Sequence, residues 1–232
     1  MTVIDFHSHI LPDIDDGSAS VEMSLAMLKM AAEQGIRQMV ATPHFYPQQD
    51  SPDCFLERRE RAAAQLQNLM TDELPQITLG AEVYFFRGMS QSDQLSRLTI
   101  QGKKCILIEM PAAPWTEEMY RELEAIRIQR GIVPIIAHVD RYIGPFRTYG
   151  IPKRLEELPV LVQANASFFL NKHTAGAALR MLKADRIHLL GSDCHNLTTR
   201  KPNLADAWQC IDRKLGQSAQ RRIESYQRSV LE

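Results

Sequence analysis

The chain has 232 residues, and its 27 lysines and arginines nearly balance 28 aspartates and glutamates, giving a formal net charge of −1. Because these charges are scattered along the chain, they argue against a polybasic surface for nucleic acid or membrane. An α/β barrel of this length folds around one core, so we expect a single domain spanning residues 1–232.

The start of the chain enters a short apolar run at 2–6 without a positively charged region before it. The run is too short for a signal peptide or a membrane span, so we expect a cytoplasmic protein with no membrane insertion. Four cysteines lie far apart, at Cys54, Cys105, Cys194 and Cys210. Their spacing indicates reduced thiols rather than a disulfide framework or a zinc ribbon.

Continuous apolar runs alternate with helical patterns along the chain. Seven runs are typical of strands that are buried on both faces. They lie at 3–6, 38–42, 77–80, 105–108, 133–137, 160–163 and 187–191. Alternation with helices predicts parallel pairing through right-handed crossovers. We therefore expect an α/β fold, best a closed or nearly closed seven-stranded (β/α) barrel, with an open doubly wound sheet as the alternative.

Three helices have recognisable ends or faces. The first is predicted to begin near Ser20 and to stop at Gly35, and Gly131 is predicted to end a helix that begins after Thr116. The segment 51–70 is polar and rich in arginine. Its mixed charges indicate a helix with a solvated face rather than a recognition surface.

Residue types that bind metals cluster just after the predicted strands. They are His7 and His9 after the first run, His44 after the second, Glu82 after the third, Glu109 after the fourth, His138 after the fifth, and Asp193 with His195 after the seventh. The C-terminal ends of parallel barrel strands meet on one face, where barrels build active sites. Five of the seven histidines lie at these positions, which favours a metal site over five separate core histidines.

The spacing of two pairs supports a shared site. Side chains alternate along a strand with period two, so His7 and His9 point to the same side. Asp193 and His195 repeat this arrangement, and Cys194 between them should point away.

The loop after the first histidine pair adds Asp13, Asp15 and Asp16. One of these aspartates could complete the cluster, while the others cap the next helix or face water. His173 and His188 lack a neighbouring ligand, so we interpret them as structural.

A histidine and carboxylate set of this size suits two or three divalent ions, with one carboxylate bridging a pair of them. Such ions activate water and neutralise the charge on a phosphoryl group, so hydrolysis of a phosphate ester is the expected reaction. Arg141 and Arg200 could each clasp phosphate oxygens bidentately, with surface salt bridges as the alternative.

Seven motifs in chain order carry a resemblance to a known family. They are DFHSHILP at 5–12 with DDG at 15–17, ATPH at 41–44, GAE at 80–82, LIE at 107–109, AHVDRY at 137–142, QANAS at 163–167 and GSDCHN at 191–196. Together they resemble the capsule- and exopolysaccharide-locus tyrosine-protein phosphatases of the PHP (polymerase and histidinol phosphatase) superfamily. The resemblance runs from end to end and implies a distorted seven-stranded barrel.

This resemblance also implies three metal ions, typically Mn²⁺, with Fe, Zn or Mg as alternatives. The implied ligand sets are His7, His9, Glu82 and Asp193 for one ion, Glu82, Glu109 and His138 for a second, and Asp16, His44 and His195 for a third. Glu82 would be the bridge, and Arg141 and Arg200 would bind the phosphate. The implied substrate is the phosphotyrosine-bearing tail of a membrane-associated tyrosine autokinase that controls polysaccharide export.

The sequence departs from the family pattern at Asp140, where relatives often have glutamate, and between Ile143 and Lys153. These departures concern the docking of a protein substrate rather than the metal ligands.

Other functions remain open on the residues alone. A small-molecule phosphatase, such as histidinol-phosphate phosphatase, would use nearly the same cluster, and a non-catalytic metal-bound docking module could retain it. Cys194 and Arg200 have the Cys-x5-Arg spacing of cysteine-dependent phosphatases, but no glycine follows the cysteine to form a phosphate loop. An amidohydrolase is disfavoured because its bridging lysine is absent.

Overall fold

The computed structural model describes residues 3–143 and 150–231. Within them the strands are β1 (Val3–Ser8), β2 (Ile36–Ala41), β3 (His44–Phe45), β4 (Gln76–Leu79), β5 (Glu82–Tyr84), β6 (Cys105–Glu109), β7 (Val133–Ile136), β8 (Leu161–Asn165) and β9 (Leu189–Gly191). The α-helices are α1 (Val21–Glu33), α2 (Pro52–Gln67), α3 (Glu117–Arg130), α4 (Ile151–Glu156), α5 (Ala166–Leu170), α6 (Ala175–Lys183), α7 (Leu204–Leu215) and α8 (Gln217–Leu231). Short 3-10 turns lie at Met89–Gln91, Leu95–Leu98 and Val139–Tyr142.

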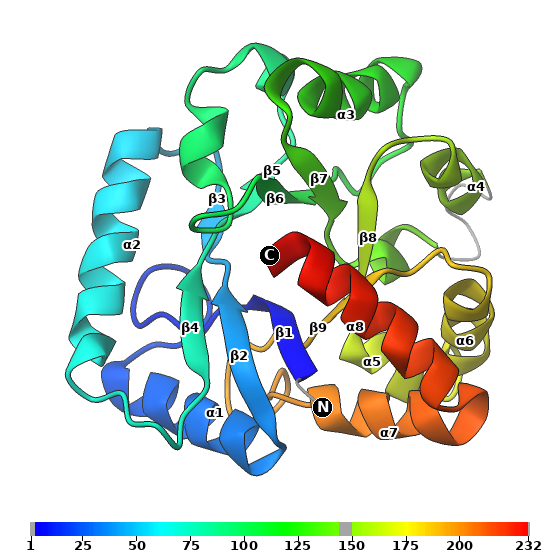
Figure 1. Ribbon diagram of the computed structural model, residues 1–232. Coiled ribbons are helices and arrows are strands. Elements are labelled where there is room, and N and C mark those ends of the chain that lie inside the picture. The colour runs from blue at the N-terminus through cyan, green and yellow to red at the C-terminus, as the bar shows by residue number, and fades with distance from the viewer. Residues whose placement is uncertain (1–2, 144–149, 232) are drawn as a thin grey trace.

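The strand pairs are parallel and form two sheets, ordered β1-β2-β4 and β3-β5-β6-β7-β8-β9. The chain passes from the first sheet to the second twice, since two residues separate β2 from β3 and two separate β4 from β5. At the other margin, Ser8 bridges Cys194, and the His9 N–H donates to the Cys194 carbonyl at 2.9 Å. The six-stranded sheet curls into half a barrel, with helices outside the strands (Figure 1).

The α/β class and the parallel pairing are confirmed, but the count of seven strands is not. Each of the seven apolar runs overlaps a strand, and β3 and β5 were missed. Both are shorter than any run that periodicity can detect, with two and three residues. Pro43 ends β2 because proline has no N–H to donate to the ladder, and β3 begins directly after it.

An apolar cluster fills the space that the strands enclose. It consists of Ile4, Phe6, Val40, Ile100, Cys105, Leu107, Ile135, Ala137, Leu189 and Val230. Val230 belongs to α8, which crosses the strands in Figure 1. The Gln227 side chain of this helix donates to the carbonyl of Ile4, near the start of β1, at 3.2 Å. Helix α8 therefore closes the end of the strands opposite to the one where the candidate ligands lie.

The predicted helix ends agree with the structure. The Ser20 hydroxyl accepts from the N–H of Met23 at the start of α1, and Thr116 and Gly131 flank α3. The helix predicted within 51–70 is α2, and its arginines are solvated except Arg59, which is 6% exposed. The Arg59 guanidinium donates to the carbonyl of Gly80 at 2.9 Å, between β4 and β5.

None of the described helices is long and apolar enough to cross a membrane. Of the segment 143–153, which departs from the family pattern, residues 144–149 lie outside the described residues.

Candidate metal centre

The end of β1 and the first residues of β3 and β5 bring three imidazoles to one carboxylate. The Oε2 atom of Glu82 lies 3.1 Å from His7 Nε2, 3.3 Å from His9 Nε2 and 3.0 Å from His44 Nδ1. The two Nε2 atoms of His7 and His9 are themselves 3.1 Å apart. Glu82 is 1% exposed, so this carboxylate lies at the buried centre of the candidate ligands.

The second oxygen of Glu82 extends the cluster toward β6 and β7. Glu82 Oε1 lies 2.7 Å from His138 Nε2. Glu109, at the end of β6, has Oε1 3.7 Å from the same His138 nitrogen and Oε2 3.9 Å from His44 Nδ1. Glu82 therefore lies between two groups of nitrogen and oxygen atoms, the position of a bridging ligand.

The opposite side of the cluster faces solvent through Asp16, whose side chain is 65% exposed. Its Oδ1 atom is 3.4 Å from both His44 Nε2 and His195 Nε2. Asp193, at the end of β9, has Oδ1 3.5 Å from the Nε2 atoms of His7 and His9. Three overlapping groups could hold a metal ion: His9, Asp16, His44 and His195; His7, His9 and Glu82; and His44, Glu82 and Glu109.

The donor atoms fit divalent ions. Among the described residues, Glu82 Oε2, His44 Nδ1 and His195 Nε2 are buried and have no hydrogen-bond partner. The 3.0 Å approach of His44 Nδ1 to Glu82 Oε2 is an ion-pair contact without hydrogen-bond geometry. Leaving such atoms unpaired in the interior costs free energy. Histidine nitrogens and carboxylate oxygens are ligands for Mn, Fe and Zn, and more than one ion would be needed to satisfy these atoms, because Glu82 and His195 belong to different candidate groups.

Hydrogen bonds on the far side of the rings turn lone pairs toward the centre. His9 Nδ1 donates to Asp15 Oδ2 at 2.7 Å, and His195 Nδ1 donates to the carbonyl of Asp193 at 2.9 Å. His7 Nδ1 lies 3.2 Å from Gln163 Oε1, which can only accept. Each Nδ1 therefore carries a hydrogen, and each Nε2 can present a lone pair to an ion.

The charges of the cluster are strongly coupled. Burial lowers the pKa of His9, but the hydrogen bond with Asp15 and the nearby negative charges of Asp15 and Glu82 outweigh it and raise this pKa to about 10. Burial raises the pKa of Asp15, and the hydrogen bond with His9 reverses this and brings it to about 2. His7, His138 and His44 similarly overcome the effect of burial on Glu82 and hold its pKa well below the usual range. The carboxylates of Asp15 and Glu82 are therefore ionised at neutral pH.

Two arginines border the cluster. Arg141 Nη2 donates to Asp193 Oδ2 at 2.6 Å, and Arg200 Nη2 donates to Asp193 Oδ1 at 2.8 Å. Their side chains are 41% and 37% exposed. Both guanidinium groups thus lie at the rim, within reach of the ligand carboxylates and of solvent.

The backbone is unusual at two strand ends. His138, after β7, has φ of 31°, and Asp193, after β9, has φ of 54°. Non-glycine residues in the left-handed region are uncommon and concentrate at functional sites. Gly191 lets β9 approach β1 closely, because a Cβ atom on it would lie 2.5 Å from the Cβ of His7.

Four residues that support the cluster were missed or left undecided by the sequence. Asp15 orients His9, although only its neighbour Asp16 was singled out. Asp5 Oδ1 accepts from the N–H groups of His7 and Ser192 at 3.1 and 2.9 Å. At the end of β8, Gln163 lies against His7, and Asn165 Nδ2 donates to Asp193 Oδ2 at 2.9 Å.

The remaining histidines and the cysteine lie apart from this chemistry. His173 is exposed, and His188 Nδ1 accepts from the N–H of Val162. Cys194 is fully buried, and this burial raises the pKa of its thiol. A buried thiol with a raised pKa is a poor nucleophile, which disfavours the Cys-x5-Arg alternative.

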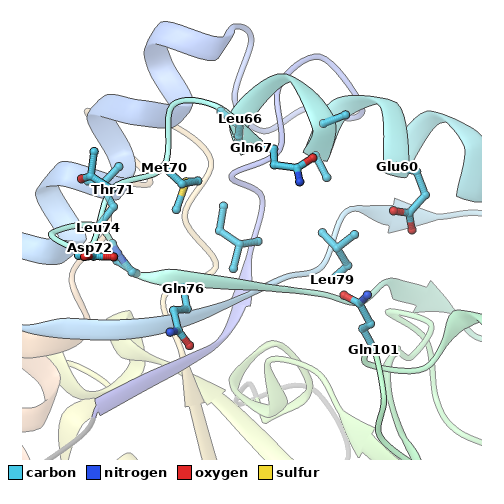
Figure 2. Close-up of a pocket in the computed structure, with 14 residues that line it drawn as sticks. Glu60, Leu66, Gln67, Met70, Thr71, Asp72, Leu74, Gln76, Leu79 and Gln101 are labelled. Atoms are coloured by element: carbon cyan, nitrogen blue, oxygen red, sulfur yellow. The ribbon is translucent and has the colours of Figure 1, made fainter.

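A cavity of about 910 Å³ lies elsewhere, between α2 and β4. Figure 2 shows Glu60 and Gln67 on α2 and Gln76 and Leu79 on β4 around it. Its lining, among the residues that the structure describes, includes no histidine, so it does not belong to the metal centre.

Fold and site together define an α/β protein with a buried histidine and carboxylate cluster able to hold divalent metal ions. The chain belongs to the family of capsular polysaccharide synthesis proteins CpsB/CapC, which it matches over residues 3–230. The family resemblance of the sequence motifs is thereby confirmed.

Named relatives are similar over most of their length. The chain is 30% identical to the tyrosine-protein phosphatase CpsB of Streptococcus pneumoniae over 229 residues, covering 92% of this chain and 91% of that protein. It is 29% identical to the tyrosine-protein phosphatase YwqE of Bacillus subtilis (strain 168) over 226 residues, covering 92% and 85%. A solved structure from work on YwqE and CpsB, both metal-dependent tyrosine phosphatases, matches with a TM-score of 0.83 at 26% identity, covering 97% of this chain and 93% of that one.

Proposed function

We propose that this chain is a metal-dependent phosphoric monoester hydrolase that removes phosphate from phosphotyrosine in proteins. One observation carries the proposal: Glu82, almost fully buried, lies against the imidazoles of His7, His9, His44 and His138. A cluster of this type catalyses hydrolysis through bound divalent ions rather than through a nucleophilic side chain. The named relatives supply the substrate class, because they are tyrosine-protein phosphatases.

Three ions, with Mn²⁺ as the first choice and Fe, Zn or Mg as alternatives, are the proposed cofactors. The proposed sets are His7, His9, Glu82 and Asp193; Glu82, Glu109 and His138; and Asp16, His44 and His195. The sharing of Glu82 by the first two sets is supported by its two oxygens, which lie against different histidines. The third set is supported by Asp16 Oδ1, which is 3.4 Å from both of its histidines.

The bound ions would supply Lewis acidity, which activates water and neutralises charge on the phosphoryl group. The chain's own residues do the rest. Arg141 and Arg200, at the rim, would bind the phosphate oxygens and stabilise the charge that develops on them in the transition state. Asp15 holds His9 in the tautomer that presents Nε2. Tyrosine leaves with a reference pKa of about 10, so it needs less protonation than an alkyl alcohol.

For the biological substrate, we propose the phosphotyrosine-bearing tail of a membrane-associated tyrosine autokinase, dephosphorylated in the cytoplasm. Membership in a family of capsular polysaccharide synthesis proteins supports this choice. We also propose that residues 1–232 form one domain, a distorted PHP-type barrel with seven strand positions. In this description β3 extends β2, and β5 extends β4, each after two residues.

The test is to strip the protein with a chelator, restore Mn²⁺, and follow phosphate release from a phosphotyrosyl peptide and from histidinol phosphate in parallel. Metal-dependent turnover that favours the peptide is expected. Preference for histidinol phosphate would support metal-dependent phosphate hydrolysis but would show that the substrate is a small molecule instead of phosphotyrosine. Full activity in chelator would refute the metal mechanism.

A matched variant separates catalysis from binding. Glu82→Gln keeps the shape of the side chain and removes its charge, so turnover should fall to background. If the chain is a non-catalytic docking module, the wild type shows no turnover with any metal, and Glu82→Gln changes nothing in the assay.

A further inference from the structure

A second cavity, of about 400 Å³, is lined by the loops after β3, β5 and β6 and by the first turns of α3. Its apolar lining consists of Phe85, Phe86, Pro111 and Met119. Phe85 is buried, and the other three are partly exposed. The cavity therefore offers apolar surface to a ligand from outside.

Two chain segments lead from candidate metal ligands into the wall of this cavity. Phe86 follows Glu82 by four residues, Pro111 follows Glu109 by two, and the Phe85 N–H donates to the Glu109 carbonyl at 2.9 Å. The ring of Tyr46 stacks on His44 with centroids 5.2 Å apart. The strands that hold candidate metal ligands thus continue directly into the cavity wall.

The ring of Tyr84 lies 5.7 Å from that of Tyr46 and immediately precedes Phe85 in the chain. Two tyrosine rings therefore lie beside a candidate metal ligand, and the backbone continues from the second of them into the wall of the cavity.

The charged side chains around the cavity already have partners within the protein. Arg87 Nη2 lies 3.2 Å from Glu118 Oε2, and Glu122 Oε1 accepts from the N–H of Ser90 at 2.6 Å. A charged ligand would have to compete with these partners. An apolar ligand would need only the walls of phenylalanine, proline and methionine, and methionine sulfur adds favourable contacts with aromatic rings.

We propose that this cavity binds one large apolar side chain of the phosphotyrosyl substrate, located within a few residues of the phosphotyrosine. The inference rests on the proposed function. A volume of about 400 Å³ is near the lower end of ligand pockets, which span about 300–1,000 Å³. It suits a single side chain of an extended peptide rather than a folded element. An extended chain advances about 3.3–3.6 Å per residue, so neighbouring positions can reach different parts of the rim.

The test uses phosphotyrosyl peptides that are identical except for phenylalanine or serine at one position, scanned over about four residues on each side of the phosphotyrosine. The manganese-loaded full chain is assayed for kcat/KM on each pair, with p-nitrophenyl phosphate as a substrate without neighbours. Partial burial of a phenylalanine side chain should raise kcat/KM by about tenfold at one position. Phe86→Ala and Met119→Gln should bring that ratio close to one.

The control variant is Ile128→Gln, which makes an apolar-to-amide change on the same helix as Met119 at a side chain that is 71% exposed. It should keep the wild-type ratio. Turnover of all substrates without any preference for phenylalanine would refute the docking cavity and leave the phosphatase intact. Retention of the phenylalanine preference by both cavity variants would refute the docking cavity in the same way. No turnover of any phosphotyrosyl or aryl substrate with any divalent metal would refute the proposed function and the inference that rests on it.

Discussion

Replacing Asp15 with asparagine tests whether hydrogen bonding behind the ligands tunes the metal centre. The Asp15 side chain is 5% exposed, and its Oδ2 atom accepts from His9 Nδ1 at 2.7 Å. The same oxygen accepts from the N–H of His44 at 3.0 Å, and Oδ1 accepts from the N–H of Gly17. Asparagine has the same shape but no charge, and its amide can present an N–H to His9.

The expected loss follows from the role of Asp15 as a carboxylate that orients a ligand. Removing such a partner lowers metal affinity by about 10- to 100-fold, equivalent to about 1.4–2.7 kcal/mol. We expect a loss within this range, since one carboxylate oxygen holds both the His9 ring and the backbone of His44.

In the assay, the metal-free protein is titrated with Mn²⁺. Binding is measured by calorimetry and by the recovery of phosphatase activity. Asp13→Asn is the matched control, because Asp13 is exposed in the same loop and should bind Mn²⁺ like the wild type. An Asp15→Asn affinity within twofold of the Asp13→Asn value, in a protein of unchanged melting temperature, would refute the reasoning.

Three further predictions concern the Cys194 thiol, the release of protons when Mn²⁺ binds, and the buried Arg59. Cys194→Ser should keep most manganese-dependent kcat/KM, because the thiol is buried; loss of activity in a normally folded variant would revive cysteine catalysis. Since His9 has a pKa of about 10 without metal, it is protonated at pH 7, so Mn²⁺ binding should release protons and tighten as pH rises. Calorimetry in buffers of different ionisation enthalpy measures this release, and buffer-independent heats would contradict it. Arg59→Met should lower the free energy of unfolding in urea by about 1–3 kcal/mol, because the Gly80 carbonyl loses its donor. The control is Arg61→Met, on the exposed face of α2. Equal losses of stability in the two variants would contradict the argument.

The candidate ligands were predictable because strand ends and period-two spacing are properties of the sequence. His7 lies in β1 and His9 directly follows this strand, and their side chains meet on the same side. The same spacing joins Gln163 and Asn165 at the end of β8, but amides were overlooked because they are not typical metal ligands. A search for any paired polar side chains at strand ends would have found them.

Other features depend on tertiary contacts that no local pattern encodes. Asp15 and Asp16 are adjacent in one loop, yet Asp15 contacts His9 and Asp16 contacts His44 and His195. Arg59 is one of several arginines on α2, and only the packing of this helix against the β4–β5 junction buries it.

Helix α8 gives the fold a particular order of assembly. The bond from Gln227 to Ile4 joins residues 223 positions apart, and that from Ser192 to Asp5 spans 187 positions. During synthesis, β1 emerges long before either partner exists, so the histidines at its end cannot be fixed in place until the chain has been made as far as these partners. Contacts of such long range slow folding, and a partly synthesised chain would expose the apolar strands around β1 to association with other chains. Metal loading is therefore expected only after β1 has met the segments that hold Ser192 and Gln227.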